Sequence, residues 1–191
     1  PGEAGAPEIP TGFAAKKVAY SRSFMVVAAN PLATKAGCDV LKAGGSAVDA
    51  AIAVQMVLSL VEPQSSGVGG GAFLMHYNGK DVEAFDGRET APAAADDKLF
   101  LGADGKPMPF YDAVVGGRSV GVPGTVRMLE LAHKQYGRLP WATLFQPAIT
   151  LAEGGFKVSA RLNTLLKAEQ HLKKDPVAAA YFYNAAGEPW P

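Results

Sequence analysis

Residues 47–61, with the sequence AVDAAIAVQMVLSLV, are apolar on nearly every face that a helix would present. Such a helix has to be buried on all sides, so the segment predicts a central helix with other elements packed around it. Ser46 precedes it and Asp49 follows three residues later, a short variant of the capping box that begins helices. Glu62 and Pro63 end it, because the residue before a proline avoids helical backbone angles. The chain has 191 residues, 48% of them hydrophobic, which suffices to build a core around this helix.

The remaining sequence alternates helix and turn signals around a single hairpin. Asn30 and Pro31 predict the start of a helix over 32–43, which ends at a Gly-Gly pair. Residues 1–17 are rich in Pro, Gly and Ala and are expected to be flexible. The other predicted elements are a strand over 25–29, hairpin strands over 71–77 and 80–86 around Asn78-Gly79, a short helix with turns within 96–112, and helices over 125–137, 142–155 (with Pro147 at its start or at a kink) and 159–174. These elements predict an α/β or α+β fold.

A glycine-rich loop follows the apolar helix and resembles a nucleotide-binding loop. In EPQSSGVGGGAFLM, Gly67, Gly69 and Ala72 have the G-x-G-x-x-A spacing of a dinucleotide fingerprint. That fingerprint binds pyrophosphate only when a strand leads into the glycines and a helix leads out. Here a helix leads in and a strand leads out, so the sequence disfavours phosphate binding. Glycines in this order are expected to give the backbone clearance beside the buried helix, or to line a wall close to a substrate.

A second short motif, GRSVG over residues 117–121, matches the nucleophile elbow of esterases and makes Ser119 a candidate nucleophile. The elbow requires a helix directly after the serine, but Val-Pro-Gly at 122–124 interrupts it. Only Ser119, Glu153 and His171 keep the order of a hydrolase triad, with no local pattern in support. A glycine-rich loop before a helix is the favoured interpretation.

Metal and thiol chemistry find little support in the sequence. His76, His133 and His171 are scattered, without the close pairs that metal sites use. Cys38 is the only cysteine, which leaves no internal disulfide and no thiolate metal site, and its helical context predicts a small core residue. No metal site and no cofactor are therefore expected.

Arg88 is the candidate binding residue. It stands in Asp86-Gly87-Arg88-Glu89, at the predicted end of the second hairpin strand. A guanidinium at such a place is able to hold a carboxylate through two parallel hydrogen bonds. A local ion pair with Asp86 or Glu89, or simple solvation, explains the same residue types equally well.

Overall charge limits the kinds of partner. Lys and Arg number 18, and Asp and Glu number 18. A neutral balance argues against a nucleic-acid or anionic-membrane partner. The longest apolar stretch, residues 50–61, is interrupted by Gln55 and Ser59 and is too short to span a membrane. The start of the chain has the look of a mature N-terminus from which a targeting segment has been removed.

Several long motifs, in the same order, resemble γ-glutamyltranspeptidases. They are KAGGSAVDAAIAVQMVLSLVEPQSSGVGGGAFLMHY, FDGRETAPAA, GVPGTVRMLELAHKQYG and FQPAITLAEGGFKVS, and together they run from about Met25 to Ser159. The resemblance implies part of an N-terminal nucleophile hydrolase fold, an αββα sandwich of four layers, and hence an α+β class. It implies that residues 1–191 are a single incomplete domain, the N-terminal portion of the large subunit. A precursor in this family cuts itself into a large and a small subunit.

The resemblance also carries expectations about function. The nucleophile is the threonine that begins the small subunit, so no catalytic residue is expected in this chain, which alone should be inactive. The substrate is glutathione or a related γ-glutamyl compound, and the acceptor is water, an amino acid or a peptide. Arg88 matches the arginine that holds the α-carboxylate of the γ-glutamyl group, although Gly87 stands where the family usually has Phe.

Partners, location and alternatives follow from the same resemblance. The expected partners are the small subunit and the remainder of the large subunit, and the expected location is periplasmic or secreted. A cephalosporin acylase or a poly-γ-glutamate-processing enzyme of the same fold is the nearest alternative. A non-catalytic scaffold or partner-binding fragment is the alternative from a different class.

Overall fold

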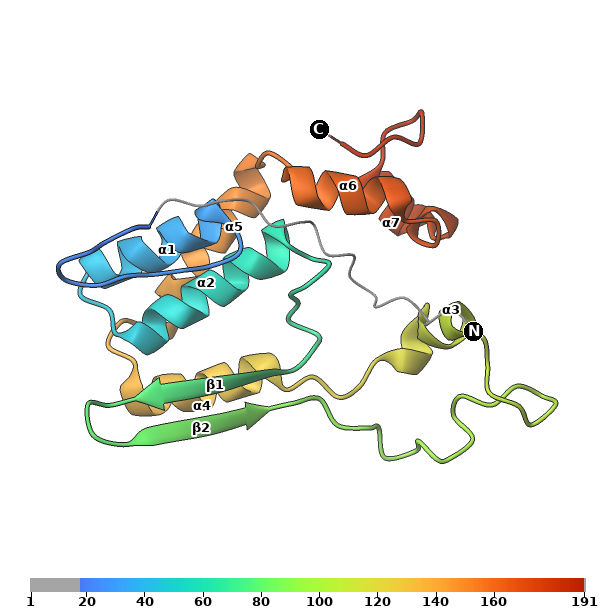
Figure 1. Cartoon of the computed structure of the whole chain (residues 1–191), viewed down its shortest axis with the longest axis horizontal. Helices are drawn as coiled ribbons and strands as arrows, with labels where there is room; N and C mark the ends of the chain where they lie inside the picture. Colours follow the sequence, from blue (N-terminus) through green and yellow to red (C-terminus); the bar gives the residue numbers. More distant parts are fainter. Residues whose placement is uncertain (1–17, 191) are drawn as a thin grey trace.

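The computed structural model describes residues 18–190, and Figure 1 shows helices gathered on a single β-hairpin. The expectation for residues 1–17 lies outside the described residues. In chain order the elements are α1 (Pro31–Lys42), α2 (Ala47–Val61), β1 (Ala72–Tyr77), β2 (Val82–Gly87), α3 (Phe110–Val114), η1 (Gly117–Ser119), α4 (Thr125–Tyr136), η2 (Trp141–Phe145), α5 (Gln146–Gly154), α6 (Ala160–Ala168), η3 (Leu172–Lys174) and α7 (Pro176–Phe182), where η marks a 3-10 turn.

Helix α2 lies at the centre of the main core, as its all-round apolar sequence predicts. It contacts α1, α4, α5 and η2. Its side chains Ile52, Val57 and Val61 are at most 1% exposed, which puts them among the most deeply buried of the described residues. Burying an aliphatic side chain of this size stabilises the fold by about 1.5–3 kcal/mol, so α2 supplies much of the force that gathers the other helices.

The start of α2 is fixed by a buried carboxylate with two tasks. Asp49 completes the predicted capping box, since the Ser46 N–H donates to its Oδ2 (2.9 Å) and the Asp49 N–H donates to the Ser46 hydroxyl (3.1 Å). The same Oδ2 also accepts from the backbone N–H groups of Arg138 (2.9 Å) and Leu139 (3.1 Å). Asp49 is 0% exposed, so one carboxylate ties the first turn of α2 to the turn that follows α4.

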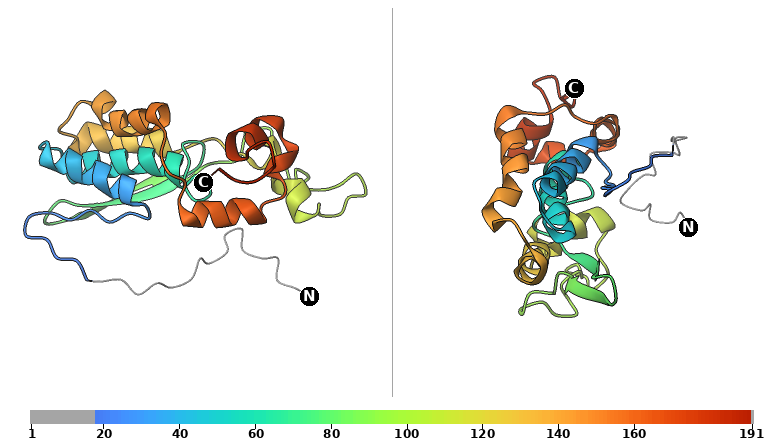
Figure 2. Two further views of the ribbon diagram at one scale, coloured as in Figure 1. Left: turned by 90° about the horizontal axis from the view of Figure 1, so that it is seen from above. Right: turned by 90° about the vertical axis from the view of Figure 1, so that its left-hand side faces the viewer.

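Strands β1 and β2 form an antiparallel pair with Tyr77 opposite Val82 and Ala72 opposite Gly87. The predicted Asn-Gly turn is confirmed: the Asn78 side chain accepts from the backbone of the turn, and Gly79 has φ +101°, which favours glycine. One face of the hairpin carries Leu74 and Phe85 into the core, where β1 and β2 contact α4. Figure 2, seen from two further sides, shows the helices covering one side of the hairpin.

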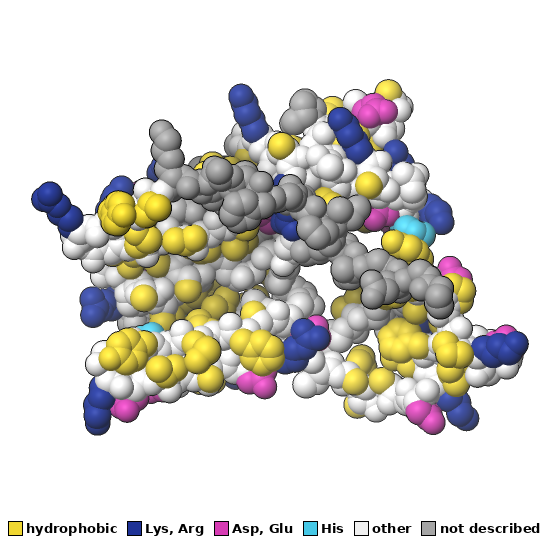
Figure 3. All heavy atoms as spheres, in the orientation of Figure 1, with side chains coloured by type: hydrophobic (Ala, Val, Ile, Leu, Met, Phe, Trp, Pro, Cys, Tyr) yellow, Lys and Arg dark blue, Asp and Glu magenta, His cyan; other side chains and the backbone are white. Residues whose placement is uncertain are grey.

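The other face of the hairpin is apolar and uncovered in this chain. Its large side chains are Phe73, Met75, Tyr77 and Val82, with exposed fractions of 69%, 74%, 64% and 58%. They come from alternate positions of β1 and from the start of β2, and Figure 3 shows hydrophobic side chains in a row along the hairpin. We call these four residues the apolar sheet face. A contiguous apolar surface of this kind marks a contact with another part of a protein.

Three predictions about secondary structure are wrong. Residues 25–29 form no strand, and Val27 is 82% exposed, since none of the described segments pairs with this backbone. Within 96–112 the chain makes turns and an isolated bridge between Leu101 and Pro107 until α3 begins at Phe110. The predicted helix 159–174 ends at Ala168, because Asp175 caps a separate helix, α7, that begins with Pro176. Pro147 stands in the first turn of α5, which is one of the two places predicted for it.

Between β2 and α4 the chain makes a long excursion, residues 88–124. A bridge between Thr90 and Val122 closes its base, with the Val122 N–H donating to the Thr90 carbonyl at 2.8 Å. Figure 1 shows α3 far out on this excursion. There Tyr111 stacks on His171, with ring centroids 4.2 Å apart, so the excursion contacts the segment between α6 and α7.

We predict that Asp49→Ala loosens the turn after α4 in the complete protein. Removing the carboxylate leaves the partly buried N–H groups of Ser46, Arg138 and Leu139 without this acceptor, which costs about 1–3 kcal/mol for each hydrogen bond lost to a charged group. Hydrogen exchange of peptides containing Arg138 and Leu139 measures the effect as a large loss of protection. The control is Asp39→Ala, because Asp39 lies exposed on α1 beside Lys35 and Lys42. Unchanged protection at residues 138–139 contradicts the role given to Asp49.

We also predict that the isolated 191-residue chain self-associates and binds a hydrophobic dye, because the apolar sheet face is open. The apolar helix α2 does not provide this open surface, since other helices of the chain cover it. Met75→Lys should reduce both association and dye binding. Val177→Lys is the matched control, since Val177 is 77% exposed on α7, away from this face. A monomer without dye binding, or equal effects of the two substitutions, contradicts the prediction.

Candidate functional site

Arg88 follows β2 directly and is the first residue of the long excursion over 88–124. Its backbone N–H donates to Asp86 Oδ1 at 2.9 Å, which turns the chain out of the strand. Its guanidinium Nη1 lies 3.3 Å from Glu89 Oε1, and the side chain is 64% exposed. The local ion pair weighed from the sequence is therefore present, with Glu89. A guanidinium has five N–H donors, so this single pairing is compatible with binding a carboxylate as well.

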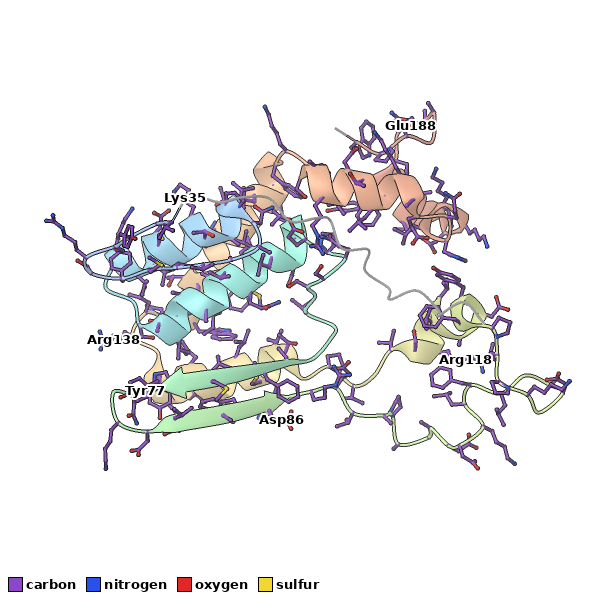
Figure 4. The ribbon with its side chains drawn as sticks, in the orientation of Figure 1. Lys35, Tyr77, Asp86, Arg118, Arg138 and Glu188 are labelled. Carbon is purple, nitrogen blue, oxygen red and sulfur yellow. The ribbon has the colours of Figure 1, made fainter. Side chains whose placement is uncertain are left out.

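An open cavity of about 420 Å³ lies beside Arg88. Residues 86–88 and Thr90 form one side, and residues 122–124 with helix α4 as far as Lys134 form the other. Its charged lining residues are Asp86, Arg88, Arg127, Glu130 and Lys134, three cations against two carboxylates. Figure 4 labels Asp86 at the end of the hairpin and Tyr77 at the opposite end.

Two of the three cations of this cavity share one carboxylate. Lys134 Nζ lies 2.6 Å from Glu130 Oε1, and Arg127 pairs with Glu130 Oε2. These hydrogen bonds, first from Lys134 and then from Arg127, hold the pKa of Glu130 below its usual value. Glu130 is therefore ionised at neutral pH, and its negative charge partly offsets the positive charges of Arg127 and Lys134. Arg88, on the other side, is the cation positioned next to the end of the sheet.

The glycine loop has no phosphate-binding geometry. It leads into strand β1, and the N-terminus of helix α4, which does reach the loop, already donates the N–H groups of Gly124 and Thr125 to the Gly70 carbonyl. The predicted backbone clearance is found at Gly71, where an added Cβ would lie 2.6 Å from the Glu89 nitrogen. At Gly67, Gly69 and Gly70 a Cβ would meet no atom closer than 3.9 Å. The crowded position is therefore the last glycine of the loop, which lies against the residue after Arg88.

Ser119 is not arranged as a nucleophile. It ends the 3-10 turn Gly117–Ser119, and its hydroxyl donates to the Val114 carbonyl at 2.7 Å. Helix α4 begins only at Thr125, so the strand–serine–helix order of an elbow is absent here. His171, the base in the only ordered triad, stacks on Tyr111 instead.

The histidines and the cysteine occupy separate environments. His76 packs on the ring of Tyr136, with centroids 3.9 Å apart, and His133 Nε2 lies 2.8 Å from the Leu139 carbonyl oxygen. Cys38 is half-buried on α1, so it is less enclosed than the predicted core residue. Among residues 18–190 no three His, Cys, Asp or Glu side chains gather as a metal site would require.

Sequence reasoning missed two residues, Thr125 and Glu89, that contact the glycine loop next to Arg88. Thr125 is 1% exposed, and its hydroxyl (3.0 Å) and its N–H (3.2 Å) both donate to the Gly70 carbonyl. Glu89 places Oε2 directly against Gly71, with no hydrogen-bond partner for that atom among the described residues. The GVPGT stretch predicts a helix start at Thr125, but its hydroxyl caps nothing there, and its bond to the distant Gly70 carbonyl leaves no local signal.

Another missed cluster joins the start of the glycine loop to α6. Glu62 is 2% exposed and accepts from the Asn30 side chain (3.0 Å), from Gln64 (2.5 Å) and from Arg161 Nη1 (3.1 Å). Arg161 also donates to the Ser65 hydroxyl at 3.1 Å. Sequence reasoning assigned Asn30 and Glu62 only to helix ends, because the distant Arg161 leaves no local signal.

Comparison with known families decides the relationship. The family model described as gamma-glutamyltranspeptidase matches residues 33–191. This chain belongs to the γ-glutamyltranspeptidase family. The match extends past Ser159, where the recognised motifs end.

Similar proteins and solved structures support the same family assignment. The chain is 43% identical over 176 residues to the glutathione hydrolase proenzyme of Bacillus subtilis strain 168, covering 91% of this chain and 30% of that protein. It is 41% identical over 169 residues to glutathione hydrolase 3 of Arabidopsis thaliana, covering 86% and 25%. The crystal structure of Helicobacter pylori γ-glutamyltranspeptidase superposes with a TM-score of 0.84 at 34% identity, covering 91% of this chain and 50% of that one.

The likeness confirms the predicted family and the α+β class, as part of the N-terminal nucleophile hydrolase fold. Residues 18–190 contain helices packed on one face of a two-stranded sheet, and the other face of that sheet is open. The chain spans about 30% of the length of the first curated relatives it matches. In the described range no helix has the length and apolar character needed to cross a membrane.

Proposed function

We propose that the complete protein containing this chain transfers the γ-glutamyl group of glutathione or a related compound to water, amino acids or peptides. The observation that carries the proposal is the place of Arg88 in a chain of this family. It stands at the end of β2, largely exposed, beside an open cavity. A guanidinium so placed binds the α-carboxylate of a glutamyl group through two charge-assisted hydrogen bonds.

The covalent chemistry is proposed to lie outside this chain. The given sequence contains no Thr-Thr-His stretch, and among residues 18–190 the Ser119 hydroxyl bonds to backbone carbonyls and to no basic side chain. In the proposed reaction the hydroxyl of a threonine beginning the small subunit attacks the γ-carbonyl carbon, and the amine of the same threonine takes the proton. The substrate's amine leaves with a proton, and water or an amine then attacks the γ-glutamyl ester and restores the hydroxyl.

Substrate class separates this proposal from its nearest alternatives. Solved relatives include the Bacillus anthracis transpeptidase CapD, with a TM-score of 0.69 at 36% identity, and a cephalosporin acylase of Bacillus halodurans, with 0.68 at 32%. These cover 90% and 94% of this chain. Arg88 favours a substrate that carries an α-carboxylate, and the Helicobacter pylori γ-glutamyltranspeptidase has the higher TM-score of 0.84. Glutathione or a similar γ-glutamyl compound is therefore the preferred substrate, with a poly-γ-glutamate chain next.

The partners and the location are part of the same proposal. The small subunit and the remainder of the large subunit are the expected partners, and the open apolar sheet face supports a large contact with them. Taken as an isolated piece, the chain then acts as a scaffold that contributes a binding residue, as a single incomplete domain. A periplasmic or secreted location rests on the resemblance to bacterial enzymes, and cell fractionation tests it.

We predict that Arg88→Ala in the complete protein lowers kcat/KM for a γ-glutamyl substrate by about 10²-fold, from a loss of roughly 3 kcal/mol of charge-assisted hydrogen bonding. Arg88→Lys should recover only part of this, because an ammonium group cannot reproduce the planar fork. The measurement is steady-state kinetics with the substrate and with its analogue lacking the α-carboxylate. Arg88→Ala should lose the preference for the carboxylate-bearing compound.

The control for this prediction is Arg118→Ala. Arg118 is an exposed arginine on the same excursion, and its guanidinium donates to the Leu99 carbonyl at 2.7 Å, so kinetics should stay near wild type. If Arg88→Ala keeps the preference, or if wild type has none, Arg88 does not hold the substrate carboxylate. Equal losses in both arginine variants would point to a general effect of surface charge.

We predict separately that the purified 191-residue chain releases no p-nitroaniline from γ-glutamyl-p-nitroanilide above a buffer blank. It lacks the proposed threonine nucleophile, and loss of a nucleophile alone typically costs about 10⁶-fold in kcat. The complete, processed protein is the positive control. Activity of the isolated chain would refute the assignment of the nucleophile to another segment.

A further inference from the structure

The Arg88–Glu89 peptide runs through a channel of glycines. Gly71 lies on one side, where an added Cβ would be 2.6 Å from the Glu89 nitrogen and 2.9 Å from the Arg88 Cα. Gly124 lies on another, where a Cβ would be 2.7 Å from the Gly87 carbonyl carbon and 3.0 Å from the Arg88 carbonyl oxygen. At Gly121 a Cβ would be 3.0 Å from the Thr90 carbonyl oxygen and 3.1 Å from the Glu89 Cβ. We call Gly71, Gly121 and Gly124 the glycine channel.

These glycines are needed for space and not for backbone angles. None of the three has a positive φ, whereas Gly44, Gly79, Gly105, Gly116, Gly155 and Gly187 do. An alanine therefore fits the local backbone conformation at all three channel positions. At Gly124 an alanine meets only backbone atoms, those of Gly87 and Arg88, which have no rotamer to change. At Gly71 and Gly121 it meets the Glu89 side chain as well as nearby backbone atoms.

The walls of the channel are fastened to each other. The Gly70 carbonyl accepts from the N–H groups of Gly124 and Thr125, both at 3.2 Å, and from the Thr125 hydroxyl at 3.0 Å. The bridge between Thr90 and Val122 joins the segment after Arg88 to the segment that leads into α4. The glycine loop and the start of helix α4 are hydrogen-bonded to each other, and α4 is packed in the core. We therefore expect an added methyl group to displace the peptide between them, which carries Arg88.

We infer that the glycine channel is a set of positioning residues that fixes where the Arg88 guanidinium stands for the substrate carboxylate. The inference rests on the carboxylate-binding role proposed for Arg88 and extends it to three glycines packed around its backbone. The two parallel hydrogen bonds between a guanidinium and a carboxylate form only when the two groups are correctly positioned. A shift on the order of 1 Å of a binding group costs up to about 10²-fold in rate. Adding one carbon at Gly124 therefore weakens carboxylate recognition by displacing Arg88, without removing any charged group.

The experiment measures the preference for a γ-glutamyl substrate over its analogue lacking the α-carboxylate, in the complete, processed protein. The preference is the ratio of the two kcat/KM values, so a variant that is merely less stable lowers both values and leaves the ratio unchanged. Gly124→Ala should lower the ratio at least about tenfold. Gly154→Ala is the control, because Gly154 lies at the end of α5 with no atom within 4 Å of an added Cβ.

A double variant separates positioning from other effects. In an Arg88→Ala background, Gly124→Ala should lower the preference no further, because the group it positions is gone. If Gly124→Ala does not accumulate as processed protein, Gly121→Ala takes its place, since contacts of 3.0–3.1 Å are tolerated with small shifts. It should lower the ratio by about threefold, a loss smaller than that of a full displacement.

The outcomes are distinguishable. If Arg88→Ala abolishes the preference while Gly124→Ala and Gly121→Ala both retain it, the channel does not position Arg88 and this inference is overturned. If Arg88→Ala retains the preference, the proposed role of Arg88 fails first. A lowered ratio in Gly124→Ala that falls further in the double variant shows an effect independent of Arg88 and also overturns the inference.

Discussion

Burial of helix α2 is the constraint on which the other contacts of this chain depend. An apolar helix has to be covered on every side, and α1, α4, α5 and η2 provide the cover. Helix α4 is shared, because it packs on α2 and also on the inner face of the hairpin. The hairpin therefore takes its position from a helix that in turn takes its position from α2. Asp49 fixes one end of this stack by joining the first turn of α2 to the turn after α4.

The other end of α2 leads to the candidate site. Glu62, buried beside Asn30 and Arg161, anchors the point where the helix gives way to the glycine loop. The loop then passes under the Arg88–Glu89 peptide and enters β1, while Thr125 holds its Gly70 carbonyl from the start of α4. Arg88 is thus supported from three places in the chain, and the position of its backbone is set by the core rather than by the exposed excursion.

Local signals explain what the sequence could predict. The cap at Ser46, the Asn78-Gly79 turn and the all-round apolar α2 each act within a few residues, and the structure confirms all three. The prediction of a first strand failed because distant parts of the chain decide strand pairing. A strand over 25–29 needs a partner that none of the described segments provides. Arg88 was noticed from its neighbours, but Gly71 and Gly124 reach it only through the fold, so no pattern in the sequence joins them.

The site and the open surface share one sheet. Side chains alternate along β1 and β2, so the same strands that turn Leu74 and Phe85 into the core turn Phe73 and Met75 outward. Asp86 lies on that outward side at the end of β2, and Arg88 follows it at the margin of the face. Under the proposed assembly, a partner segment covering the apolar sheet face would also remove water from around Arg88. A guanidinium–carboxylate pair is stronger where water is excluded, so the contact that completes the fold would also strengthen substrate recognition.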